Sequence, residues 1–237
     1  MTILNRINKK EEDGSYMRMN ISEAVRTWAT RKGDELAVSG THKITYSELN
    51  SVAEIYSKNI QDTLPYMHKK IAILTNDNIK FISYLLGIIR SGNIFVLINP
   101  NLTDKQINKS LEKINCKYYV SDKLGRELTA KKLSLSEEPA IVKSSKMPSH
   151  THDNIGITED AGVIFSSGTT GEPQAIMRNS FSILSEVIQW IIELRLQRET
   201  TFLIPRPLYY TGGFILMYST LFAGGRVDLL DDISSES

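Results

Sequence analysis

The sequence predicts an α/β protein whose sheets are mixed but largely parallel and are covered by helices. Two observations lead to this prediction. Short, continuous apolar runs such as Lys70–Thr75 and Asn93–Ile98 have the length and composition of strands that are buried on both faces. Segments with helical periodicity separate these runs, and a strand–helix–strand alternation places its crossover helices over a parallel sheet.

The first half of the chain contains an amphipathic helix, a hairpin and a series of alternating strands and helices. Capping residues such as Asn20 mark helix starts, Thr45 or Ser47 caps the second helix, and Gly92 marks a helix end. In chain order, we expect a helix at Asn20–Lys32, strands at Glu35–Ser39 and Lys43–Tyr46, a helix at Tyr46–Gln61, a strand at Lys70–Thr75, a helix at Ile79–Ser91, a strand at Asn93–Ile98, a helix at Thr103–Ile114 and a strand at Lys117–Val120.

The second half begins with a polar stretch, residues 123–157, which we interpret mostly as a surface connection with one strand at Ala140–Lys143. His150 and His152 have the spacing of two metal ligands on a strand, but no third ligand accompanies them, so we favour a loop. The remaining expected elements are a strand at Ala161–Phe165, a helix at Ser180–Leu194 with Trp190 in the core, a strand at Thr201–Ile204, a helix at Phe214–Phe222 and a strand at Val227–Leu230.

Composition and charge exclude several classes of protein. The 237 residues carry a formal net charge of +1, which gives no argument for a nucleic-acid or anionic-membrane partner. The single cysteine, Cys116, excludes an internal disulfide and is interpreted as a packing residue. The chain shows neither a secretory signal nor an apolar run of about 18 residues. We therefore expect a cytoplasmic protein with a polar lead at residues 1–16 and one α/β domain over residues 17–237.

A loop rich in glycine and hydroxyl groups follows the strand at Ala161–Phe165. It reads Ser166-Ser167-Gly168-Thr169-Thr170-Gly171-Glu172-Pro173. Glycines let the backbone approach a ligand, and successive N–H groups in such a turn can hold an anion. The pattern is compatible with a loop that closes over a polyphosphate and with an ordinary polar turn. It is neither a Walker A motif nor a dinucleotide fingerprint, since the Walker A lysine and the G-x-G-x-x-G pattern are both absent from it.

The sequence SSGTTGEPQAI resembles the phosphate-binding signature of the adenylate-forming enzymes, the AMP-dependent synthetases and ligases. The match is contiguous through Pro173, after which Gln174 and Ala175 stand where the family has lysine and glycine. The resemblance implies that ATP and Mg²⁺ are cofactors and that Thr170 lies near the metal. The implied nucleotide-binding residues are Ser166, Ser167, Gly168, Thr169, Thr170, Gly171 and Gln174.

A second segment, PRPLYYTGGF at residues 205–214, resembles the family's Pro-x-aromatic-His-x-x-Gly stretch, which precedes a helix at the acyl-substrate pocket. Here Tyr210 occupies the histidine position and Gly213 the glycine position. The resemblance implies that substrate contacts come from Tyr209, Tyr210, Gly212 and Gly213. As residue types, the two tyrosines are equally compatible with partly buried packing aromatics, so both interpretations stay open.

The function implied by the resemblance is activation of a carboxylic acid by ATP to an acyl-adenylate, followed by thioester formation. The acceptor would be coenzyme A or a carrier-protein phosphopantetheine. Only the N-terminal portion of the family pattern is found here, because the later motifs and the small C-terminal domain are absent from these 237 residues. We therefore expect a partial or split enzyme with little activity by itself, no assignable catalytic residue, and a complementary C-terminal polypeptide as partner.

Two alternatives remain from the residues alone. The departures at Gln174 and Ala175 favour a catalytically inactive protein that keeps the fold as a binding or regulatory module. A generic α/β domain with a chance glycine-rich turn is the third interpretation. Surface apolarity distinguishes the first two, because a partial enzyme exposes faces that its missing part would cover, whereas an evolved module stays monodisperse.

Overall fold

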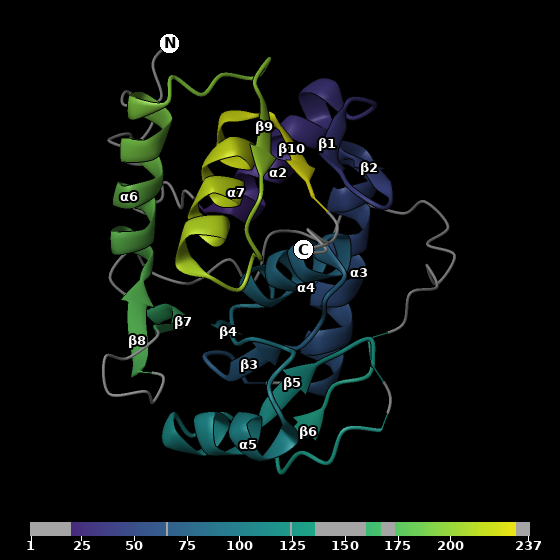
Figure 1. Ribbon diagram of the computed structural model, residues 1–237. Helices are drawn as coiled ribbons and strands as arrows, with labels where there is room; N and C mark the ends of the chain where they lie inside the picture. Colours follow the sequence, from purple (N-terminus) through teal and green to yellow (C-terminus); the bar gives the residue numbers. More distant parts are fainter. Residues whose placement is uncertain (1–19, 65, 124, 136–159, 167–173, 231–237) are drawn as a thin grey trace, which may run out of the picture.

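The computed structural model describes residues 20–64, 66–123, 125–135, 160–166 and 174–230. They form two sheets with helices packed around and between them (Figure 1). The four-stranded sheet has the order β2-β1-β10-β9, and the six-stranded sheet has the order β6-β5-β3-β4-β7-β8. Only the β1–β2 and β7–β8 pairings are antiparallel among the described strands, so the predicted mixed, largely parallel α/β fold is confirmed.

The strands and helices fall close to the predicted ranges. The four-stranded sheet consists of β1 (Leu36–Ser39), β2 (Lys43–Thr45), β9 (Thr201–Ile204) and β10 (Arg226–Leu229). The six-stranded sheet consists of β3 (Lys70–Ile73), β4 (Ile94–Leu97), β5 (Tyr118–Val120), β6 (Lys131–Lys132), β7 (Asp160–Ser166) and β8 (Gln174–Asn179). The described helices are α2 (Ile21–Lys32), α3 (Tyr46–Thr63), α4 (Asn78–Arg90), α5 (Asp104–Lys113), α6 (Ser180–Glu193) and α7 (Thr211–Ala223).

Helix starts are set by side-chain caps, as the sequence predicts. The Asn20 side chain accepts a hydrogen bond from the Glu23 amide, and the Asp77 side chain accepts one from the Lys80 amide. Thr45 and Thr103 each form a complete capping box with the residue three positions on. These bonds satisfy amides that have no partner within the helix, and they fix where each connection enters its helix.

A single apolar cluster joins the two sheets through the central helices α4 and α7. It includes Val38 and Val227 from the small sheet and Ile71 and Phe95 from the large one. Ten of the 13 residues of α7 are buried, which matches its continuous apolar sequence. A second cluster lies between the large sheet and α5, so the large sheet is covered on both faces. This explains why its inner strands are apolar without alternation.

Several sequence predictions are corrected or lie outside the described residues. Trp190 is 39 % exposed on α6 and is not a core residue. Strands β6 and β8 were not anticipated. Cys116 is buried as predicted, and burial raises the pKa of its thiol to about 11. The predicted lead at residues 1–16, the strand at Ala140–Lys143 and both paired histidines fall outside the described part of the chain.

No helix in the described ranges is long and apolar enough to cross a lipid bilayer. No three His, Cys, Asp or Glu side chains in the described ranges lie together in a way that could hold a metal ion.

Candidate functional site

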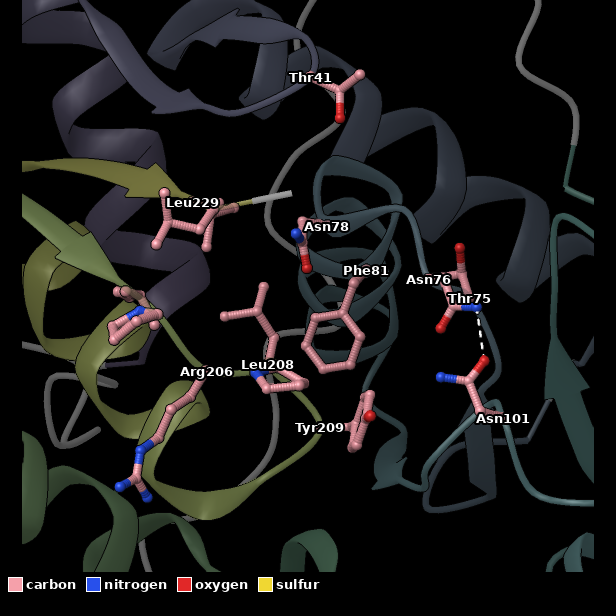
Figure 2. A pocket seen from close by; sticks show the side chains of 14 residues that line it. Thr41, Thr75, Asn76, Asn78, Phe81, Asn101, Arg206, Leu208, Tyr209 and Leu229 are labelled. Carbon is pink, nitrogen blue, oxygen red and sulfur yellow. Dashed lines mark hydrogen bonds between the residues drawn. The ribbon is translucent and has the colours of Figure 1, made fainter. Parts of the chain in front are cut away.

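The carboxyl ends of both sheets meet around one cavity of about 700 Å³ (Figure 2). Its walls come from the turn after β1 and from the segments that follow β3, β4, β9 and β10. The lining residues are Thr41, Thr75, Asn76, Asn78, Phe81, Asn101, Ile204, Pro205, Arg206, Pro207, Leu208, Tyr209, Leu229 and Leu230. Open parallel sheets bind ligands in crevices outside the carboxyl ends of their strands, so this cavity is the candidate site.

Polar side chains from three separate loops meet on one side of the cavity. The Asn76 Nδ2 atom donates a hydrogen bond of 2.8 Å to Asn101 Oδ1, as Figure 2 shows. Tyr209, from the segment that follows β9, lines the same cavity. The bond between the two asparagines links the segments that follow β3 and β4 at the carboxyl edge of the large sheet.

The paired tyrosines differ in their surroundings. Tyr209 lines the cavity. Partial burial, and to a smaller extent the neighbouring Tyr210, raise the pKa of the Tyr209 hydroxyl, and the nearby Asn101 side chain opposes this rise. Tyr210 is 48 % exposed, lies beside Tyr209 with ring centroids 4.6 Å apart, and precedes α7 without a side-chain cap. The structure therefore places Tyr209 at the cavity and Tyr210 next to it, and their contact with a substrate stays a prediction.

The two glycines at the start of α7 have different environments. A Cβ atom at Gly213 would lie 2.5 Å from the carbonyl oxygen of Pro207, so the absence of a side chain lets α7 pack against the preceding loop. A Cβ atom at Gly212 would meet nothing within 4 Å. Close backbone packing thus accounts for Gly213 in this structure, whereas Gly212 faces open space. The predicted substrate contacts of both glycines remain predictions.

The glycine-rich loop stands between the antiparallel strands β7 and β8. Its two ends lie at the carboxyl edge of the large sheet, which is the edge that borders the cavity. Ser166 at the end of β7 pairs with Gln174 at the start of β8. Leu97 of β4 pairs with Ile164, so Ser166 lies at the edge where the Asn101 loop leaves β4. The intervening predicted nucleotide residues, Ser167, Gly168, Thr169, Thr170 and Gly171, lie outside the described residues. The exposed Gln174 begins the returning strand.

Two contacts hold this hairpin in place. Gly162 on β7 leaves no room for a side chain, because a Cβ atom there would overlap the ring of Phe95 on β4. On β8, the Arg178 guanidinium bonds Ser182 and forms a 2.9 Å ion pair with Glu186 of α6. The hairpin is therefore anchored to the sheet on one side and to a helix on the other.

Sequence reasoning missed the amide residues of the cavity. Asn76 precedes the helix expected at Ile79–Ser91, Asn101 precedes the helix expected at Thr103–Ile114, and neither belongs to a recognised ligand-binding motif. Asn76 lies three residues after the end of β3, and Asn101 lies four residues after the end of β4. The rule that ligands bind at the carboxyl ends of parallel strands could have identified them. Their meeting with Tyr209 could not be foreseen, because it depends on how the two sheets are placed.

Comparison with known proteins identifies relatives over nearly all of the chain. A family model described as "AMP-binding enzyme" matches residues 25–236. Malformin synthetase mlfA of Aspergillus sclerotiicarbonarius is 23 % identical over 215 residues, which is 88 % of this chain and 4 % of that protein. Tyrocidine synthase 3 of Brevibacillus parabrevis is 21 % identical over 196 residues, or 80 % of this chain and 3 % of that protein.

Solved structures share the fold at low sequence identity. The N-terminal subdomain of NpsA from Klebsiella oxytoca matches with a TM-score of 0.75 and 18 % identity, over 89 % of this chain and 54 % of that one. The N-terminal domain of FACL13 from Mycobacterium tuberculosis matches with a TM-score of 0.71 and 16 % identity, over 90 % and 58 %. This chain thus spans little more than half of these solved chains and a small fraction of the curated relatives.

Proposed function

This chain belongs to the family of AMP-binding enzymes, and from that premise we propose that it contributes the N-terminal part of a site that activates a carboxylic acid with ATP. In that reaction a carboxylate oxygen attacks the α-phosphorus, the bond to the bridging oxygen breaks, and pyrophosphate leaves with the electron pair. Such transfers depend on positioning and charge neutralisation more than on covalent help.

One observation supports this proposal above the others. The hairpin that carries the glycine-rich loop begins at the sheet edge from which the cavity-lining loops also leave. A nucleotide held by the loop and an acid held in the cavity would therefore lie close together. The loop would hold the β- and γ-phosphates and their Mg²⁺ ion, which neutralises phosphate charge. Transfer to coenzyme A or to a carrier-protein thiol would follow.

The test is the affinity of the purified chain for MgATP before and after Gln174→Lys. The new ammonium would stand where the loop returns to the sheet, opposite Ser166. One added charge-assisted hydrogen bond to a phosphate is expected to tighten MgATP binding about tenfold, measured by isothermal titration calorimetry.

Ile176→Lys is the matched control, because Ile176 is exposed on the same face of β8. It introduces the same charge about 7 Å farther from the loop. A clearly smaller gain for this variant indicates a local phosphate contact. An unchanged affinity for Gln174→Lys, or an equal gain for both variants, would contradict nucleotide binding at the loop.

The noncatalytic binding module remains the second candidate, and the exposed apolar surface argues against it. Phe181 and Ile192 on α6 are 60 % and 62 % exposed and lie three helical turns apart on one face. Other exposed apolar side chains on α6, β8 and β9 are Ile176, Met177, Trp190, Leu194 and Leu203. Such faces are typical of surfaces that pack on further polypeptide. A complementary segment of the same family domain is the proposed occupant.

This proposal predicts self-association of the isolated chain. The double variant Phe181→Lys/Ile192→Lys is expected to shift the protein toward monomer, because it removes apolar area from the exposed face of α6. Size-exclusion chromatography with light scattering measures the change. Gln189→Lys, an exposed polar position on the same helix, adds charge without removing apolar surface and should leave association nearly unchanged. A monodisperse unmodified chain would favour the binding module.

A further inference from the structure

We propose that Arg178 is a positioning residue for nucleotide binding. Its guanidinium fixes the angle between β8 and α6, and this angle sets where the glycine-rich loop returns to the large sheet at Gln174. The inference rests on the proposed function, because it takes the loop as the place where MgATP binds. It goes beyond that function by assigning a part in nucleotide binding to a side chain that lies outside both the loop and the cavity lining.

Strand β8 and helix α6 join without a connecting loop. The strand ends at Asn179, and the helix begins at Ser180. Asn179 is the N-cap of α6, and its side chain accepts a 2.8 Å hydrogen bond from the Ser182 amide. The strand extends about 13 Å from Arg178 to Gln174, so a tilt of about 10° at the junction would move Gln174 by about 2 Å. A small change of angle at α6 is therefore large at the loop.

The Arg178 guanidinium holds this angle through three bonds to α6. Its Nε atom donates to Ser182 Oγ at 3.1 Å, and one Nη atom donates to the Ser182 carbonyl oxygen at 3.1 Å. The same Nη atom pairs with Glu186 Oε2 at 2.9 Å. The two partners lie four and eight residues after Arg178, so one planar group spans two turns of the helix. A rigid fork with several bonds fixes a direction as well as a distance.

The rest of β8 gives this direction little other support among the described residues. The strand lies at the edge of the large sheet, and none of its six residues is buried. Its pairing with β7 is irregular at the junction. Arg178 pairs with Gly162, and the next residue of β8 pairs with Asp160, so β7 carries one extra residue there. An extra residue of this kind bends and twists a strand pair, so the pairing alone does not fix the angle at the junction.

Helix α6 is the fixed reference to which Arg178 ties the strand. Its inner row, Ile183, Leu184 and Val187, is buried in the core. Ser219 Oγ of α7 donates a 3.4 Å hydrogen bond to the Val187 carbonyl oxygen. Arg178 thus relates the position of the loop's return to the packed core. Displacements of about 1 Å can weaken the alignment of a bound group severely, so this relation matters for phosphate contacts.

A double-mutant cycle between Arg178→Met and Gln174→Lys tests the inference. Arg178→Met is expected to weaken MgATP binding about fivefold in calorimetry, as for one weakened hydrogen bond. In the Arg178→Met background, Gln174→Lys should tighten binding only about twofold instead of about tenfold. Substitutions this far apart normally act additively, and a loss of stability alone would leave the gain from the new lysine unchanged. An equal gain in both backgrounds would overturn the inference.

Two further variants assign the effect to the contact with α6. Glu186→Met should weaken MgATP binding, and adding it to Arg178→Met should cause no further loss. Arg226→Met is the matched control, because the Arg226 guanidinium forms bonds of 2.6 and 2.9 Å with Asp228 on β10, in the other sheet. Its MgATP affinity should stay unchanged. Thermal unfolding verifies that every variant is folded at the titration temperature. An equal loss for Arg226→Met would contradict the assignment.

The unmodified chain separates this inference from the function on which it rests. If it binds MgATP and Arg178→Met binds MgATP equally well, the positioning inference is wrong and the nucleotide function stands. If the unmodified chain does not bind MgATP, the proposed function itself is wrong and the inference falls with it.

Discussion

Replacing Gly162 by alanine is expected to lower the free energy of unfolding by about 3 kcal/mol, the upper end of the cost of inserting one carbon into a packed core. The new Cβ atom would overlap Cε2 and Cζ of Phe95. Phe95 is only 1 % exposed, and its ring packs on Phe214 of α7 with centroids 5.3 Å apart. The ring cannot retreat without displacing α7, which follows the cavity-lining residues 204–209. Urea denaturation of the two proteins measures the difference.

A matched glycine and a compensating change make this prediction specific. Gly212→Ala adds the same methyl group in open space and in the first turn of α7, so stability should stay the same or rise slightly. Phe95→Leu removes ring atoms at the point of overlap, and the double variant Gly162→Ala/Phe95→Leu should recover much of the loss. Equal stability of Gly162→Ala and the unmodified protein would contradict the close β4–β7 packing.

Most of the fold could be predicted because its signals are local. Caps such as Asn20 and Thr45 fix helix starts through bonds to amides three residues away, and no distant contact is needed. Strand β8, in contrast, lies at a sheet edge and mixes polar and apolar residues without alternation. It is held by pairing with β7, a tertiary interaction that periodicity does not report.

Trp190 shows why burial is harder to predict than helicity. Helix α6 is apolar on more than one side, and its inner row is Ile183, Leu184 and Val187. A helix with excess apolar residues has no unique inward face in the sequence. The side that is covered depends on where neighbouring elements lie, and this is decided only in three dimensions.

The candidate site shows the same difference between local sequence signals and contacts that form only in the folded protein. Tyr209 could be singled out because it stands in a recognisable linear segment, and it does line the cavity. Asn76 and Asn101 are 25 positions apart and carry no motif, so only the packing of two strands brings their amides to 2.8 Å. Linear motifs therefore identify candidate loops more readily than the separate side chains that packing brings together around a cavity.

Replacing Arg90 by methionine is expected to destabilise the protein by about 3 kcal/mol, because it breaks a buried polar network while largely keeping side-chain volume. The guanidinium is 3 % exposed and bonds Ser22 Oγ at 2.9 Å, Asn50 O and Oδ1 at 3.1 Å each, and Glu54 Oε2 at 2.8 Å. These partners belong to α2 and α3, so one side chain of α4 ties three helices together. Burial is the main cause that lowers the pKa of the Arg90 guanidinium, and the positive charge of Arg26 is the second. The carboxylate of Glu54 opposes this shift.

Methionine at position 90 would leave the Asn50 and Ser22 groups without their donor, and thermal and urea unfolding should both report the loss. Arg198→Met is the control, because Arg198 pairs with its neighbour Glu199 in full solvent. Its replacement should cause no measurable change in the free energy of unfolding. If Arg90→Met proved as stable as that control, the buried guanidinium network would make no net contribution to stability. A loss confined to Arg90→Met instead shows that the buried guanidinium helps to join α2, α3 and α4.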